Sequence, residues 1–190
     1  MGAYDHVIVL LSFVYALALT HLLSRIGAMV IERERVRFSA LLSLAAVNAI
    51  LFVFANWLAI WDLRSMRDWD LFSVMSNFLF AIGIYFVCIL AAPEAATEGP
   101  IDMEAFYWRN RRLFHGTLMF CVLISLVINA EFLKTANTAL FLEENAMVLP
   151  MIPAIALPLF LPARWAQWAG GIAFLLLLTA FMVLFSGSLR

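Results

Sequence analysis

Long apolar blocks alternate with short polar segments along the whole of this 190-residue chain. A bilayer core of about 30 Å requires roughly 20 helical residues to cross it, so a block of about that length predicts a transmembrane helix. Six blocks qualify, and they cover residues 6–31, 39–62, 70–92, 112–133, 146–162 and 166–187. The pattern therefore predicts an all-α fold, in which residues 1–190 form a single transmembrane domain built as a bundle of six transmembrane helices.

The fifth block carries the weakest helical signal because prolines interrupt it. These are Pro150, Pro153, Pro158 and Pro162. An interior proline removes a backbone donor and kinks a helix. In lipid, the freed carbonyls must be satisfied by neighbouring helices or by water. We expect a kinked span that is held by its neighbours, with a re-entrant segment as the alternative.

Two of the segments between the blocks are long enough to form helices of their own. Asp102 is a favoured residue type at helix N-caps. Residues 103–112 then combine aromatic side chains with a basic end, which predicts a short amphipathic helix in the cytoplasmic headgroup plane. Residues 135–145 are expected to lie at the other surface in the same way.

Composition agrees with a membrane protein and excludes several other classes. The chain is 65% hydrophobic with 13% charged residues, whereas about a quarter of a soluble domain is charged. Its net charge of -1 does not favour binding to nucleic acid, which requires a basic face. Cys88 and Cys121 both lie inside apolar blocks, so we expect two small buried side chains and no disulfide framework.

Arginines gather at alternate ends of the predicted helices. One side would hold Arg33, Arg35, Arg37, Arg109, Arg111, Arg112 and Arg164, and the other Arg64, Arg67, Lys134 and Arg190. By the positive-inside rule, the first set faces the cytoplasm. The sequence thus predicts a multi-pass protein of the cell membrane with both termini outside the cytoplasm.

Polar side chains also occur within the apolar blocks, where they are costly and commonly functional. The candidate intramembrane polar site comprises His21, Arg25, Asn48, Asn56, Asn77, His115 and Asn129. Such residues can enclose a polar cavity between the first four helices. Alternatively, they hydrogen-bond helices together, each interaction contributing roughly 0.6 kcal/mol.

Two of these residues raise specific alternatives. Imidazole titrates near neutral pH, so His21 is either a proton relay or metal ligand, or a structural link to Asn48 or Asn56 of the second helix. Arg25 lies close enough to the cytoplasmic surface to reach lipid headgroups, which we favour over a substrate clamp. No cofactor and no metal site are predicted, and haem ligation by His21 and His115 is kept as an alternative.

No catalytic residues are predicted. The Glu143-Glu144 pair is followed by Val148, where intramembrane CAAX-type proteases need arginine, and no Gly-x-Ser-x-Gly nucleophile motif occurs. We therefore expect a non-enzymatic subunit or scaffold that contacts membrane lipids and either self-associates or binds a partner membrane protein. The alternatives are a small transporter or channel with a polar path lined by the first four helices, and a haem- or quinone-binding electron-transfer protein.

Overall fold

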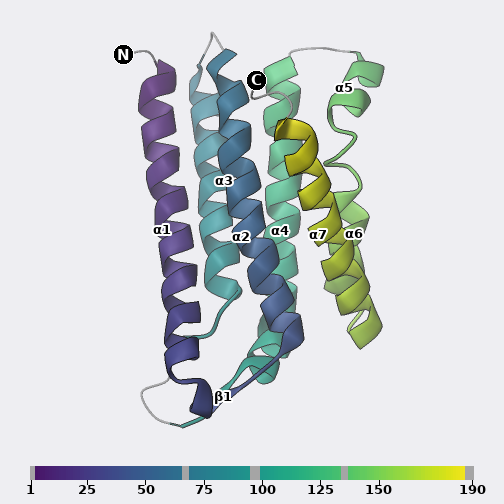
Figure 1. The fold of residues 1–190 in the computed structure, drawn as a ribbon. Coiled ribbons are helices and arrows are strands. Elements are labelled where there is room, and N and C mark those ends of the chain that lie inside the picture. The colour runs from purple at the N-terminus through teal and green to yellow at the C-terminus, as the bar shows by residue number, and fades with distance from the viewer. Residues whose placement is uncertain (1–2, 66–68, 95–98, 134–136, 187–190) are drawn as a thin grey trace.

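The computed structural model describes residues 3–65, 69–94, 99–133 and 137–186. These residues form seven α-helices, namely α1 (Ala3–Ile31), α2 (Ala40–Ala59), α3 (Leu71–Leu90), α4 (Met103–Leu133), α5 (Thr138–Glu144), α6 (Met151–Phe160) and α7 (Arg164–Ser186) (Figure 1). Two 3-10 segments, η1 (Arg33–Arg35) and η2 (Ile60–Ser65), and two short strands, β1 (Val36–Arg37) and β2 (Ile101–Asp102), complete the described structure. The predicted all-α class is confirmed.

Five of the helices have the length and apolar composition needed to cross a membrane: α1, α2, α3, α4 and α7. Their outward faces carry large apolar side chains, among them Phe13 and Leu176, which are 66% and 64% exposed. Soluble monomers rarely expose large contiguous apolar surfaces. The protein is therefore an integral multi-pass membrane protein.

The sixth predicted span, over residues 146–162, is not a helix of membrane length. Only α6 is helical there, and its ten residues extend about 15 Å, half of the bilayer core. Hydrogen-bonded turns precede it, with the amides of Val148 and Leu149 donating to the carbonyl of Asn145. Pro150 stands at the N-cap of α6 and Pro162 follows its C-cap, so prolines bound the helix at both ends. The count of six spans is not confirmed.

The prediction of a separate amphipathic helix over residues 103–112 is wrong. Those residues are the first turns of α4, a continuous helix of 31 residues. The expected cap is present, because the carboxylate of Asp102 accepts a hydrogen bond from the amide of Ala105 at 2.9 Å. Tyr107 and Arg111 are buried, so one face of this stretch packs against the bundle. Within the other predicted segment α5 is helical over residues 138–144, residues 135–136 lie outside the described part of the chain, and the place of this helix at a membrane surface stays a prediction.

Several chain segments meet at one end of the bundle, which we call the arginine end. There β1 pairs in parallel with β2, Arg37 forms an ion pair with Asp102 at 2.9 Å, and Arg164 forms one with Glu104 at 2.8 Å. Figure 1 shows α5 and the start of α1 at the other end, which we call the opposite end. The side of the membrane that each end faces stays a prediction.

Small residues allow close helix contacts, as expected of membrane bundles. A Cβ atom added at Gly83 would lie 2.6 Å from the sulfur of Cys121, where α3 meets α4. One added at Gly170 would lie 2.5 Å from the carbonyl oxygen of Ala154, where α7 meets α6. Both cysteines are fully buried, which confirms their predicted role as small core side chains.

Candidate functional site

The structure distributes the predicted polar residues over several helix contacts instead of gathering them in one place. Arg25 donates hydrogen bonds to the carbonyl oxygens of Ala92 at 2.9 Å and Ile89 at 3.4 Å. These carbonyls lie at the C-terminal end of α3, where a basic side chain satisfies acceptors that the helix leaves free. Arg25 therefore binds the C-terminal end of α3, and its guanidinium also lies 3.9 Å from the carboxylate of Glu94; its contact with lipid headgroups stays a prediction.

His21 also faces α3 and not α2. Its ring centroid lies 6.0 Å from that of Tyr85, and its buried Nε2 atom has no hydrogen-bond partner among the described residues. Asn48 instead donates to the carbonyl of Gly171 in α7 at 2.9 Å, while Asn56 donates to Phe52 within α2. The predicted link from His21 to either asparagine is wrong.

The two remaining buried candidates bond to their own helices. The side chain of Asn77 donates to the carbonyl of Ser73, and Nδ1 of His115 lies 2.8 Å from the carbonyl oxygen of Arg111. His115 packs edge-on against Phe114 with ring centroids 5.1 Å apart. Since His21 contacts α3 and His115 contacts aromatic residues of α4, the two histidines have separate surroundings. The described residues hold no cluster of three or more side chains placed to bind a metal ion.

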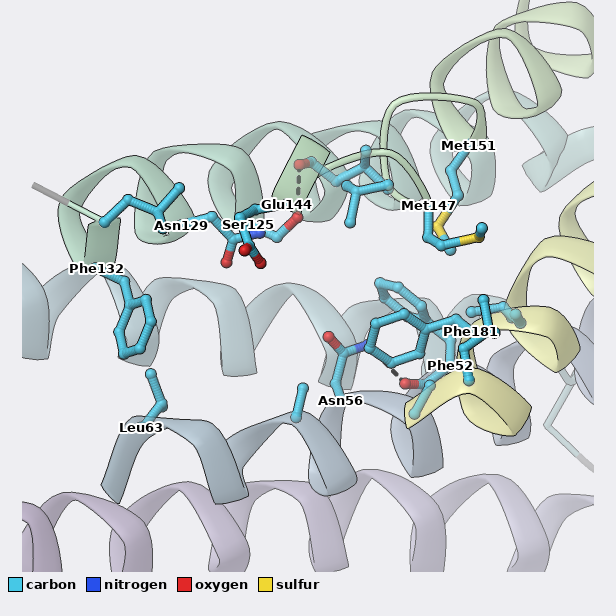
Figure 2. Close-up of a pocket in the computed structure, with 17 residues that line it drawn as sticks. Phe52, Asn56, Leu63, Ser125, Asn129, Phe132, Glu144, Met147, Met151 and Phe181 are labelled. Atoms are coloured by element: carbon cyan, nitrogen blue, oxygen red, sulfur yellow. Dashed lines mark hydrogen bonds between the residues drawn. The ribbon is translucent and has the colours of Figure 1, made fainter. Parts of the chain in front are cut away.

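Asn56 and Asn129 do share a site, because both line a cavity of about 360 Å³ between α2, α4, α6 and α7 (Figure 2). α5 and η2 border this cavity toward the opposite end of the bundle. Its lining residues are Phe52, Ala55, Asn56, Ala59, Leu63, Val122, Ser125, Asn129, Phe132, Leu133, Glu144, Met147, Val148, Met151, Leu178, Phe181 and Leu184. We had expected a polar cavity between the first four helices. The observed cavity instead lies between α2, α4, α6 and α7, so α6 and α7 take the places expected for α1 and α3.

Asn56, Ser125 and Asn129 each use one donor in a hydrogen bond within the protein. The side-chain amide of Asn56 donates to the carbonyl of Phe52 at 2.7 Å, and the hydroxyl of Ser125 donates to the carbonyl of Val122 at 2.8 Å. Asn129 donates to the side-chain oxygen of Asn145 at 2.7 Å. Figure 2 shows Asn56 across the cavity from Ser125 and Asn129. The oxygen atoms of these three side chains accept no hydrogen bond from the described residues, so acceptors are available to a ligand, and each asparagine amide also keeps a second N–H.

The charge and the apolar lining of the cavity indicate the same kind of ligand. Glu144 is the acidic lining residue, and no lysine or arginine is among the residues that line the cavity. Three phenylalanines and two methionines contribute to its walls. Aromatic faces attract cations electrostatically, and a carboxylate does so more strongly. The cavity is therefore suited to a molecule that combines positive charge or hydrogen-bond donors with apolar surface.

A buried polar network joins α4, α6 and α7 nearer the arginine end. Gln167 donates to the carbonyls of Pro158 at 3.0 Å and Leu161 at 2.6 Å, and its side-chain oxygen accepts from the hydroxyl of Tyr107 at 2.7 Å. Arg111 donates to the same carbonyl of Pro158 at 3.0 Å. Residue 162 is a proline without an N–H group, so the carbonyl of Pro158 lacks its helical donor. The neighbouring helices supply it, as the proline pattern led us to expect.

Sequence reasoning missed most of this network. We had counted Arg111 among the surface arginines, yet it is only 7% exposed. The available signal was the spacing of Pro158 and Pro162, which leaves a carbonyl in need of a donor, but nothing in the chain indicates which helix provides that donor.

No family model, curated protein or solved structure matches the chain. Function is therefore argued from the site itself.

Proposed function

We propose that the protein binds a small amphiphilic organic cation in the cavity between α2, α4, α6 and α7. The observation that carries this proposal is the composition of the cavity wall, in which Glu144 and side-chain oxygens with no protein donor stand among aromatic and thioether groups. A carboxylate and aromatic rings together select for cations, and binding sites with apolar walls and a few placed polar groups are typical for small ligands.

Transport is the activity that this binding would serve. Met147 and Val148, in the turns before α6, and Met151, in its first turn, all line the cavity. Non-helical backbone at membrane depth is tolerated where it is buried or lines a cavity, and substrate sites of many transporters use interrupted helices. Movement past the network of Tyr107 and Gln167 would then be needed for the substrate to reach the arginine end.

The proposal includes a sixth crossing, made by the turns before α6 and by α6 itself. It is supported by the ion pair of Arg164 with Glu104 at the arginine end, because α5 lies at the opposite end (Figure 1). Both ends of the chain would then share one side of the membrane, outside the cytoplasm by the positive-inside rule. The subunit, scaffold and electron-transfer functions stay predictions.

The test is binding of tetraphenylphosphonium to the purified full chain in detergent, measured by equilibrium dialysis. Glu144 lines the cavity and is exposed, so Glu144→Gln is expected to weaken binding about fivefold, because an exposed charge contact is worth up to about 1 kcal/mol. The matched control is Glu143→Gln, since Glu143 precedes Glu144 on α5 and is exposed like it, but does not line the cavity. It should bind within about twofold of the unmodified protein.

A neutral molecule of similar size, triphenylphosphine oxide, provides the second comparison. Weaker binding of this molecule, unaffected by Glu144→Gln, would agree with the proposal. Equal affinity of all three proteins for tetraphenylphosphonium, or no binding of it at all, would refute the proposal. Uptake of tetraphenylphosphonium into proteoliposomes, reduced by Glu144→Gln and not by Glu143→Gln, would then support transport, and binding without uptake would exclude it.

A further inference from the structure

A second hollow lies between α1 and α2 in the half of the bundle near the arginine end. It is a groove of about 560 Å³, and Figure 1 shows α2 leaning away from α1 toward this end. The groove is lined by Ile26, Met29, Val30, Arg33, Val36, Phe38, Leu42, Ser43, Ala46, Val47, Ile50, Ala91 and Met103. Apart from Arg33 and Ser43 these side chains are apolar, and the hydroxyl of Ser43 already donates to the carbonyl of Ser39 at 3.0 Å.

We propose that this groove holds an acyl chain of an anionic phospholipid and that Arg33 binds the lipid phosphate. The groove opens on the outer surface of a membrane-spanning helix pair, where the surrounding solvent is lipid. An apolar channel with one cationic residue in its lining matches a molecule with a long apolar chain and an anionic head. This site shares no residue with the cavity between α2, α4, α6 and α7, so it is independent of the proposed function.

The charge argument rests on which arginines are already paired. Arg35 contacts the carboxylate of Glu32 at 2.8 Å, and Arg37 contacts that of Asp102 at 2.9 Å. Arg33 forms no ion pair or hydrogen bond with the residues that the structure describes. Glu34 is exposed and does not line the groove. Of the three arginines in this tract, Arg33 is thus the one available to phosphate, which a guanidinium binds through paired hydrogen bonds.

The test is native mass spectrometry of the purified full chain titrated with dioleoyl phosphatidylglycerol or dioleoyl phosphatidylcholine. We expect one phosphatidylglycerol to bind more tightly than phosphatidylcholine. Arg33→Gln should lower phosphatidylglycerol retention about fivefold, because one surface charge near an anionic lipid contributes about that much, and should leave phosphatidylcholine unchanged. Val47→Trp, at an exposed lining position, should reduce retention of both lipids by occupying the groove.

Arg112→Gln is the matched control. Arg112 is also exposed and close to the arginine end, but it does not line the groove. Equal losses of phosphatidylglycerol in Arg33→Gln and Arg112→Gln would show general charge attraction and overturn the proposal. Full retention of phosphatidylglycerol in both Arg33→Gln and Val47→Trp would also overturn it. Tetraphenylphosphonium binding should be unchanged in Arg33→Gln. Failure of the lipid-binding proposal can therefore be told apart from failure of the cation-binding proposal.

Discussion

Replacing Gln167 by leucine is expected to lower the free energy of unfolding by about 2–5 kcal/mol. Gln167 is 1% exposed, and leucine of similar size would leave the carbonyl of Leu161 without its donor and the hydroxyl of Tyr107 without its acceptor. Each buried polar group left unpaired costs about 1–3 kcal/mol. The carbonyl of Pro158 keeps its bond from Arg111 and so does not add to the loss.

Reversible unfolding in mixed micelles, followed by far-ultraviolet circular dichroism, measures this loss. Thr179→Leu is the control on the same helix, because Thr179 is exposed and bonds only to its own helix; it should change stability by less than about 0.5 kcal/mol. Adding Tyr107→Phe to Gln167→Leu should restore about 1 kcal/mol or more of the free energy of unfolding, because the double variant no longer buries an unpaired hydroxyl. Additive losses in the double variant would show that the two side chains do not interact.

Replacing Gly170 by leucine is expected to destabilise the bundle by about 3 kcal/mol and to abolish tetraphenylphosphonium binding. A Cβ atom at this position would lie 2.4 Å from Cδ of Pro158 and 2.5 Å from the carbonyl oxygen of Ala154. A proline ring and a helical carbonyl cannot move aside as a flexible side chain does, so α6 and α7 must separate, and overpacking of this kind costs about 1–3 kcal/mol or more. Met151 of α6 lines the cavity, so movement of α6 would also change the shape of the cavity in which tetraphenylphosphonium binds.

Gly27→Leu is the matched substitution for this experiment. Gly27 also lies within a long helix, and nothing lies within 4 Å of a Cβ atom built there. Because leucine has the higher helix propensity by about 0.8 kcal/mol, Gly27→Leu should be neutral or stabilising. The same unfolding assay applies, and similar stabilities of the two variants would show that α6 and α7 are not in the close contact described.

The limits of the long helices could be predicted because they follow from the local sequence. Ser39 and Asp70 cap α2 and α3 by accepting hydrogen bonds from the amides of Leu42 and Ser73, and apolar runs follow both caps. The start of α4 could not be predicted, because Tyr107 and Arg111 stand four residues apart on a face that also fits a surface helix. Their burial depends on partners that are distant in the sequence, which are Gln167 of α7 for Tyr107 and carbonyls of α6 for Arg111.

The candidate site was predicted in part for a similar reason. Asn56 and Asn129 were identified because asparagine inside an apolar helix is costly unless it is paired. Their helices could not be assigned to a common cavity, since the sequence gives the faces of each helix but not its neighbours. Glu144 is exposed, as the sequence indicated, but it belongs to a helix of seven residues whose position depends on the fold of residues 145–150. Its place in the cavity lining could therefore not be predicted.

The central claim, that an organic cation enters the cavity, is tested most directly by cysteine protection at Ser125. Ser125→Cys places a thiol among the lining residues, while Cys88 and Cys121 are fully buried and should not react. In proteoliposomes, a membrane-impermeant methanethiosulfonate should label this thiol, and tetraphenylphosphonium should slow the labelling as it occupies the site. Labelling of Glu143→Cys, beside the cavity, should proceed at the same rate with or without the cation. Labelling of Ser125→Cys that tetraphenylphosphonium does not slow would contradict the account.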